Sequence, residues 1–138
     1  MRLNNEESLR WLQQAEHNFE VAKHNLAAGF YSDACFMGEQ TAQVALKAFI
    51  IANKRRHIWE PSVQELAQLC QQYDNDFSVF VEPGKILDRY YIPTRYPDAL
   101  ATPAVPYKTY TKKDGAKAIG FAEKIVELVK QKLKIGYT

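Results

Sequence analysis

The sequence predicts an all-α fold: an up-and-down antiparallel helical bundle of about five helices, with a loop rich in proline and tyrosine before the last helix. Three observations support this prediction. Apolar residues recur at intervals of three and four, no stretch alternates as a half-buried strand would, and four of the six prolines fall within residues 92–110. A chain of 138 residues forms one ordinary domain, so we assign residues 1–138 to a single unit.

The first two predicted helices have the clearest periodicity. The first covers residues 5–28 and ends at Gly29, because glycine suits the left-handed conformation that follows many helices. Its apolar face consists of Leu9, Leu12, Ala15, Phe19, Ala22 and Leu26. The second begins at Ser32 or Asp33, either of which can cap it, and runs to about Asn53. Since this helix carries few charges, we expect it to lie at the centre of the bundle.

Two shorter helical segments are predicted next. Pro61 suits the first turn of a third helix over residues 61–73. Asp76 can cap the segment that follows, residues 77–91. The Pro83-Gly84 dipeptide interrupts the pattern of that segment, so we expect either one bent helix or two short ones.

The last third of the chain combines a loop with a long helix. The prolines of residues 92–110 lack the amide hydrogen that regular structure needs, so this stretch is predicted to be extended loop. Thr111, followed three residues later by Asp114, resembles a capping box for the last helix. That helix is predicted to reach about Ile135, with Gly136 as its terminator.

Composition excludes several classes of protein. Hydrophobic residues make up 46% and charged residues 25% of the chain, which are globular values, so disorder is not expected. No apolar run approaches the roughly 20 residues needed to span a bilayer, and the polar N-terminus is not a signal peptide. We therefore expect a cytoplasmic protein with no membrane association. Cys35 and Cys70 lack metal-type spacing and are expected to be buried free thiols, and no cofactor is predicted.

The charge is unevenly distributed along the chain. Residues 1–106 carry 10 basic and 13 acidic side chains, whereas residues 107–138 carry eight lysines and three acidic residues, a local net charge of +5. Such lysines are typical of a solvated helix face, although a basic helix can also attract an acidic partner. A second basic cluster, Lys54–His57, follows the second helix, where cations favour the helix dipole. Charge alone does not identify a nucleic-acid binder.

The segment Leu87–Asp98 holds three tyrosines, two arginines, two prolines and two aspartates within twelve residues. Arginine forks and tyrosine rings are groups that hold phosphates and flat bases. A ligand-binding site is therefore predicted here. Its predicted residues are Arg89, Tyr91, Arg95, Tyr96 and Asp98, with Lys47 of the second helix as a further candidate.

The same side chains also have a structural interpretation. Asp88 or Asp98 can pair with Arg95 or Arg89, and the tyrosine rings can pack the loop against neighbouring helices. Lys47 can extend past apolar neighbours to reach solvent. The sequence leaves the ligand-binding and the structural interpretation open.

Two stretches carry a family resemblance: Ala34–Ala48 of the second helix and Leu87–Asp98, whose Tyr-Ile-Pro-x-Arg-Tyr-Pro-Asp pattern is the specific part. Together with Trp11, Ala15 and His57, they resemble the HEPN domain family (higher eukaryotes and prokaryotes nucleotide-binding) over nearly the whole chain. The resemblance implies an up-and-down helical bundle that usually forms a homodimer. It also implies, for small members, a frequent pairing with a minimal nucleotidyltransferase as toxin and antitoxin.

This chain departs from the family's catalytic pattern. Many members are metal-independent ribonucleases in which an arginine precedes a histidine by four to six residues, with two such motifs facing each other across a dimer. No histidine follows Arg89 or Arg95. Arg10 and His17 have the spacing but stand on the first helix. Gln43 stands where the family commonly has a glutamate, which weakens any role for an acid at that site. Because the arginine–histidine motif is missing from its expected position, the sequence leans away from an enzyme.

The leading hypothesis is a non-catalytic or degenerate HEPN domain. It would act as a dimeric module that binds a nucleotide, RNA or a nucleotidyltransferase, as one half of a toxin–antitoxin pair. The first alternative is a metal-independent toxin ribonuclease with an atypical site around Arg95. The second alternative is a purely structural interaction protein. No catalytic or metal-binding residue is predicted.

Overall fold

Helices make up the regular structure of the computed structural model, which describes residues 2–53 and 58–137. No strand occurs within these residues, which confirms the all-α prediction, and none of their helices is long and apolar enough to cross a membrane. The predicted basic cluster, Lys54–His57, lies outside the described residues. The elements are α1 (Arg2–Ala28), α2 (Tyr31–Ala52), α3 (Val63–Tyr73), the 3₁₀ helix η1 (Asn75–Phe80), α4 (Val81–Asp88), the 3₁₀ turn η2 (Pro97–Ala99), α5 (Pro106–Thr109) and α6 (Lys112–Tyr137).

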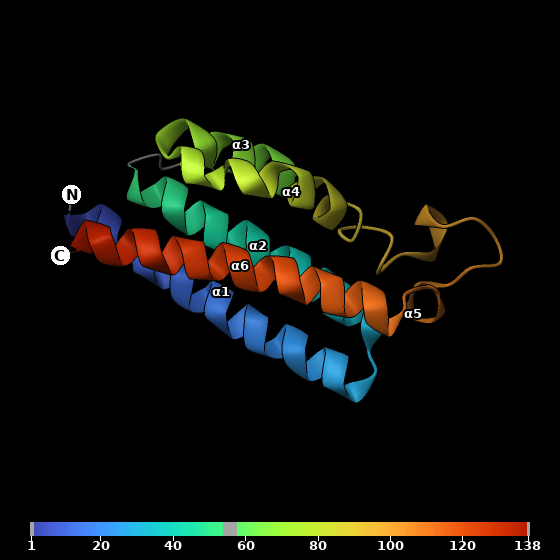
Figure 1. Ribbon diagram of the computed structural model, residues 1–138. Helices are drawn as coiled ribbons and strands as arrows, with labels where there is room; N and C mark the ends of the chain where they lie inside the picture. The colour runs from blue at the N-terminus through green and yellow to red at the C-terminus, as the bar shows by residue number, and fades with distance from the viewer. Residues whose placement is uncertain (1, 54–57, 138) are drawn as a thin grey trace.

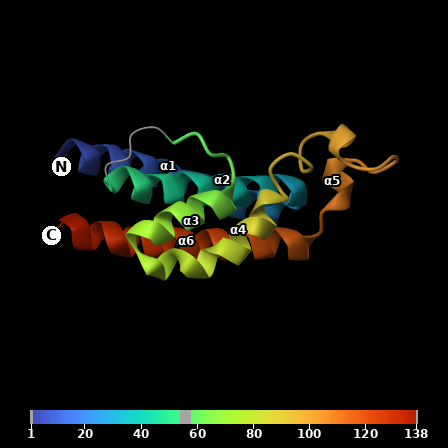
Figure 2. The same ribbon diagram turned by 90° about the horizontal axis from the view of Figure 1, so that it is seen from above.

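The long helices α1, α2 and α6 form the body of the bundle, and the shorter α3 and α4 pack together along one side of it (Figure 1). The loop before α6 projects from one end with α5, whereas α1 begins and α6 ends at the opposite end. Figure 2 shows that the chain after residue 58 runs back along the bundle before α3 begins. For this reason α2 and α3 point in the same direction, although α1 and α2, and α3 and α4, are antiparallel.

The turn between α1 and α2 follows from one glycine. Gly29 has a φ of +86°, the left-handed conformation predicted for the end of α1. The chain re-enters a helix at once: Phe30 is the N-cap residue and its carbonyl accepts from the Ala34 amide at 2.9 Å. The prediction that Ser32 or Asp33 caps α2 was therefore wrong, because both residues lie inside its first turn.

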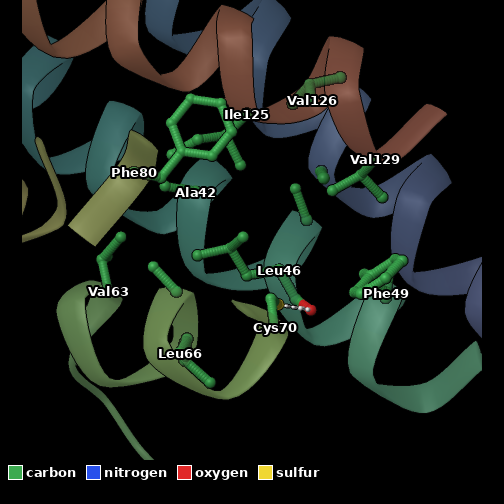
Figure 3. Packing of buried hydrophobic residues seen from close by; sticks show 14 of the residues in the cluster. Ala42, Leu46, Phe49, Val63, Leu66, Cys70, Phe80, Ile125, Val126 and Val129 are labelled. Carbon is green, nitrogen blue, oxygen red and sulfur yellow. Dashed lines mark hydrogen bonds between the residues drawn. The ribbon is translucent and has the colours of Figure 1, made fainter. Parts of the chain in front are cut away.

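Helix α2 is the central element, as its low charge predicted. Leu46 and Phe49 lie between α3 and α6 in the main cluster of buried side chains (Figure 3). The Cys70 thiol of α3 contacts the Leu46 carbonyl at 3.6 Å. Both cysteines are buried and free, as predicted, and burial raises the pKa of Cys35 to about 12 and that of Cys70 further. Neither thiol is therefore expected to be reactive.

The helix starts at α3 and η1 differ from those predicted. Pro61 was predicted to lie in the first turn of α3, but it precedes the N-cap residue Ser62, whose hydroxyl accepts from the Glu65 amide at 3.1 Å. Asp74, and not Asp76, begins η1: the Asp76 amide donates to Asp74 Oδ1 at 3.0 Å. Both predicted segments are helical, but α3 begins two residues later than predicted and the cap of η1 was misplaced by two positions.

Asp88 joins the end of α4 to the start of α3. Its carboxylate accepts from the Ser62 hydroxyl at 2.7 Å and from the amides of Val63 at 2.5 Å and Gln64 at 3.3 Å. These amides belong to the first turn of α3, where backbone donors lack partners within the helix. Since the carboxylate is used there, the expectation that Asp88 pairs with an arginine of the following loop was wrong.

The segment after α3 consists of two short helices, η1 and α4, which is one of the two predicted arrangements. The predicted interruption at Pro83-Gly84 was wrong, because the boundary lies between Phe80 and Val81, and Pro83 and Gly84 both lie inside α4. Pro83 lies in the first turn of α4, where its missing amide hydrogen is tolerated. At Gly84 the backbone of α4 lies close to that of α3. A Cβ atom on Gly84 would lie 2.8 Å from the Gln64 amide nitrogen, so only glycine fits without a shift of the backbone.

The loop and the last helix follow the prediction with small differences. Between α4 and α6 the chain is irregular apart from the short turns η2 and α5. The capping box is confirmed: the Thr111 amide donates to Asp114 Oδ2 at 2.9 Å, and the Asp114 amide donates to Thr111 Oγ1 at 3.2 Å. Gly136 does not end the helix, because α6 continues to Tyr137.

We expect Gly84→Ala to lower the free energy of unfolding by about 1–3 kcal/mol, because the new methyl group meets the backbone of α3. Gly120→Ala is the matched control, since it also lies within a helix but has open space around the added Cβ. This control should raise stability by up to about 1 kcal/mol through helix propensity. Urea unfolding of both variants measures the difference, and equal stabilisation by the two substitutions would contradict the close approach.

Candidate functional site

The turn after α4 fixes Arg95 among three aromatic rings. Its guanidinium carbon lies 4.2 Å from the ring centroid of Phe36, 5.2 Å from that of Tyr91 and 5.0 Å from that of Tyr96. Its Nε donates to the Tyr91 carbonyl at 3.0 Å. Contacts of this kind attract a cation to the faces of the rings. We call Arg95 with Phe36, Tyr91 and Tyr96 the Arg95 cluster.

Buried neighbours hold the backbone of this turn in place. The Thr94 hydroxyl donates to the Tyr90 carbonyl at 2.6 Å, and the Arg95 amide donates to the Ile92 carbonyl at 3.0 Å. Tyr90 is buried against Tyr110, with ring centroids 5.9 Å apart, and burial raises the pKa of Tyr90 to about 12. Tyr90 therefore anchors the turn, whereas Arg95 and Tyr96 are exposed.

An open hollow of about 440 Å³ lies beside Arg95, within the size range of small-ligand sites. It is formed where the loop and α5 meet the first turn of α2. Its lining residues are Ser32, Asp33, Thr94, Arg95, Pro97, Val105, Pro106 and Tyr107. We call it the Asp33–Arg95 hollow. Asp33 and Arg95 form no ion pair with each other, and Tyr107 is 69% exposed.

The other predicted site residues are dispersed. Arg89 is exposed at the end of α4, and Asp98 is exposed in η2, beside a separate hollow formed by the loop itself. Lys47 is half-buried on α2, eleven residues after Phe36, which corresponds to about 16 Å of helix. Burial lowers the pKa of Lys47, and the nearby carboxylates of Glu39 and Glu60 oppose this effect. The structure thus brings together Arg95, Tyr91 and Tyr96 but not Lys47.

One side chain that sequence reasoning missed is a carboxyl group in the core. Glu39 of α2 is fully buried and accepts from the amides of Gln40, at 2.8 Å, and Gln43. Burial raises its pKa to about 7, a nearby Asp88 adds to the rise, and the two amides and Arg95 act in the opposite direction. The signal in the sequence was a glutamate four residues before a glutamine in an otherwise apolar helix.

The catalytic pattern of the resembling family is absent from this region. No histidine occurs among the described residues that line the Asp33–Arg95 hollow or contact the Arg95 guanidinium. The pair with the numerical spacing lies on α1, where Arg10 forms an ion pair with Glu7 at 2.9 Å and His17 is exposed. Within the described part of the chain, no group of three or more metal-ligating side chains is present.

The buried acid makes stability depend on pH. Because the folded-state pKa of Glu39 is raised, its contribution to stability is complete below pH 4.5 and is lost as pH rises through about 7. Relative to Glu39→Gln, whose amide does not titrate, the wild type should lose about 3 kcal/mol of unfolding free energy between pH 5 and 8.

Urea unfolding across this pH range measures the effect. Glu123→Gln, a substitution on the exposed face of α6, is the matched control and should keep the wild-type profile. Parallel profiles for the wild type and Glu39→Gln would contradict the burial of a titrating carboxyl group.

Comparison with known proteins supports a single assignment. A model of the HEPN domain matches residues 8–132. The chain is 26% identical over 135 residues to the candidate toxin MJ1304 of Methanocaldococcus jannaschii, covering 92% of this chain and 88% of that one.

Two solved structures share the fold. The structure of TT1696 from Thermus thermophilus superposes with a TM-score of 0.78 at 35% identity, covering 91% of this chain and 97% of that one. ST0689, an archaeal HEPN homologue, gives a TM-score of 0.70 at 30% identity, with 91% and 97% covered. The matched residues include all of α2, most of α1 and α6, and the Arg95 turn. This protein therefore belongs to the HEPN domain family.

Proposed function

We propose that this protein is a non-catalytic HEPN domain that binds nucleotides or RNA ends through the Arg95 cluster. The observation that carries the proposal is that the Arg95 guanidinium has unused hydrogen-bond donors. Its Nε is bound to the Tyr91 carbonyl, and its two terminal nitrogens make no further hydrogen bond or ion pair with the described residues. The terminal nitrogens of an arginine form the fork that binds phosphate oxygens in pairs.

The aromatic rings prepare this fork for binding. An exposed arginine normally samples many rotamers, and ordering it on binding opposes affinity. The three rings of the Arg95 cluster limit that freedom before any ligand arrives. Tyr96 is 50% exposed and Tyr107 is 69% exposed, so each offers a ring face on which a base could stack. Phosphate and base are the two groups that every nucleotide presents.

Burial of Glu39 favours binding over catalysis. A carboxyl group with a pKa of about 7 is a good general acid or base near neutral pH. Glu39 is 0% exposed, however, and its contacts are two amides of its own helix, so it does not reach the surface where Arg95 lies. A general acid or base must come within hydrogen-bond distance of the reacting group.

The wider biological setting is part of the same proposal. The family resemblance supports a homodimer, and the similarity to the candidate toxin MJ1304 supports a role in a toxin–antitoxin pair in the cytoplasm. A minimal nucleotidyltransferase is the proposed partner. Co-purification of the chain with a neighbouring nucleotidyltransferase, and light scattering for the homodimer, test these two elements.

Calorimetric titration with ATP, GTP and a short RNA tests the nucleotide site. We expect binding by the wild type and a loss of about 10- to 100-fold in Arg95→Ala, because a hydrogen bond to a charged group contributes about 1.5–3 kcal/mol. Arg10→Ala removes an exposed arginine from α1 and should leave the affinity unchanged. If folded Arg95→Ala binds as tightly as the wild type, or if none of the three ligands binds, the nucleotide site is refuted.

A toxin ribonuclease that uses Arg95 is the second candidate, and its support is the similarity to MJ1304. Incubation of the pure protein with cellular RNA separates it from the binding module. The proposal above expects intact RNA at all times sampled. Cleavage by the wild type that disappears in Arg95→Ala would favour the ribonuclease, and cleavage that persists would indicate a contaminating nuclease.

A further inference from the structure

The Asp33–Arg95 hollow holds opposite charges that are not paired with each other. Asp33 lies in the first turn of α2, and Phe36, whose ring contacts Arg95, lies one turn further along the same helix. Asp33 and Arg95 therefore line the same hollow, and Arg95 contacts α2 about one helical turn beyond Asp33. No hydrogen bond or ion pair from the described part of the chain uses the Asp33 carboxylate.

The two charged groups call for different ligand atoms. A guanidinium donates hydrogen bonds, so it binds phosphate oxygens. An ionised carboxylate only accepts them, so it needs hydroxyl or amino hydrogens. The Asp33 carboxylate also offsets the positive end of the α2 dipole, which makes a second phosphate unfavourable at that end of the hollow.

Two hydroxyl side chains also line the hollow. Ser32 is 3% exposed, lines the hollow and makes no side-chain hydrogen bond within the described residues. The Thr94 hydroxyl donates to the Tyr90 carbonyl, so its oxygen remains able to accept. Hydroxyl groups of this kind both donate to and accept from an alcohol. Beside them, the exposed ring of Tyr107 forms an aromatic wall.

We propose that this hollow selects ribonucleotides by their 2′,3′-diol, with Asp33 and Ser32 holding the sugar hydroxyls while Arg95 holds the phosphate and Tyr107 stacks on the base. The proposal rests on the nucleotide site proposed above and adds its chemical selectivity. An acidic side chain that accepts from ribose hydroxyls is a known solution in dinucleotide-binding folds, and the 2′-hydroxyl distinguishes RNA from DNA.

Two kinds of ligand carry both a phosphate and a 2′,3′-diol: a free ribonucleotide and the 3′ end of an RNA. Both present a 5′ phosphate group and an unmodified 2′,3′-diol on one ribose. An internal RNA residue lacks the diol, because its 3′ oxygen is esterified. The hollow should therefore bind AMP and RNA with a 3′-hydroxyl end, and discriminate against 2′-deoxy-AMP and against the same RNA with a 3′ phosphate.

The test compares these four ligands by calorimetry or by ligand-induced NMR shifts up to millimolar concentration. For the wild type we expect AMP to bind at least tenfold more tightly than 2′-deoxy-AMP. Asp33→Ala and Asp33→Asn should reduce this preference to about threefold or less, because AMP loses the contacts of two hydroxyls and 2′-deoxy-AMP those of one. Glu123→Ala on the exposed face of α6 should keep the full preference. Thermal unfolding confirms that each variant is folded.

The outcomes separate this inference from the nucleotide site itself. Equal affinity for AMP and 2′-deoxy-AMP, both lost in Arg95→Ala, overturns the diol selectivity and leaves the nucleotide site intact. A preference that persists in Asp33→Ala overturns the role of Asp33. No binding of any of the four ligands overturns both proposals. A preference shown by AMP alone identifies free nucleotides as the source, and one shown by RNA identifies its 3′ end.

Discussion

The carboxylate of Asp88 fixes the relation between the two parts of the molecule that meet at the candidate site. The carboxylate accepts three hydrogen bonds at the start of α3. Because Asp88 is also the last residue of α4, these bonds fix the point at which the chain leaves α4. The turn that follows reaches Phe36 of α2 with Arg95. Without this carboxylate, the first amides of α3 would lack an acceptor and the end of α4 would lose its anchor. The position of Arg95 against α2 thus depends on contacts made seven residues earlier.

Local chemistry in the sequence predicted the bundle well. Periodicity identified the helices, Gly29 identified the first turn and the Thr111–Asp114 pair identified the start of α6, because each of these signals acts within a few residues. The cap of α2 was misplaced because a turn through Phe30 needs no side-chain acceptor. The role of Asp88 could not be predicted, since its partners lie about 25 residues away in sequence.

The sequence predicted the part of the candidate site that comes from the segment after α4, but not the part that comes from α2. The Leu87–Asp98 segment contains Arg95, Tyr91 and Tyr96, and its composition alone marked it as a binding segment. Asp33 lines the hollow from α2, and Phe36 of the same helix contacts Arg95. Nothing in the sequence around α2 indicated a contact with a loop sixty residues later. Tertiary packing, and not local pattern, decides which helix faces a loop.

Glu39 and Arg95 are two ionisable side chains of this region that lie in different environments. Glu39 lies on α2, one turn before Gln43, the position at which the family commonly has a glutamate. Arg95 lies in the turn after α4. Packing has separated the two: Glu39 lies in the core with two amides, whereas Arg95 lies in solvent among aromatic rings. Their charges still interact, because Arg95 opposes the rise in the pKa of Glu39. The two side chains are thus coupled electrostatically although their surroundings differ.

The arrangement of the helix ends has a practical consequence. The start of α1 and the end of α6 lie at one end of the bundle, and the loop with α5 projects from the other (Figure 1). The length of the bundle therefore separates the start of α1 and the end of α6 from the Asp33–Arg95 hollow. A fusion partner, an affinity tag or a surface linker attached at either end therefore leaves the hollow open. The same geometry would allow the domain to be inserted into a larger chain as a side module that faces away from its host.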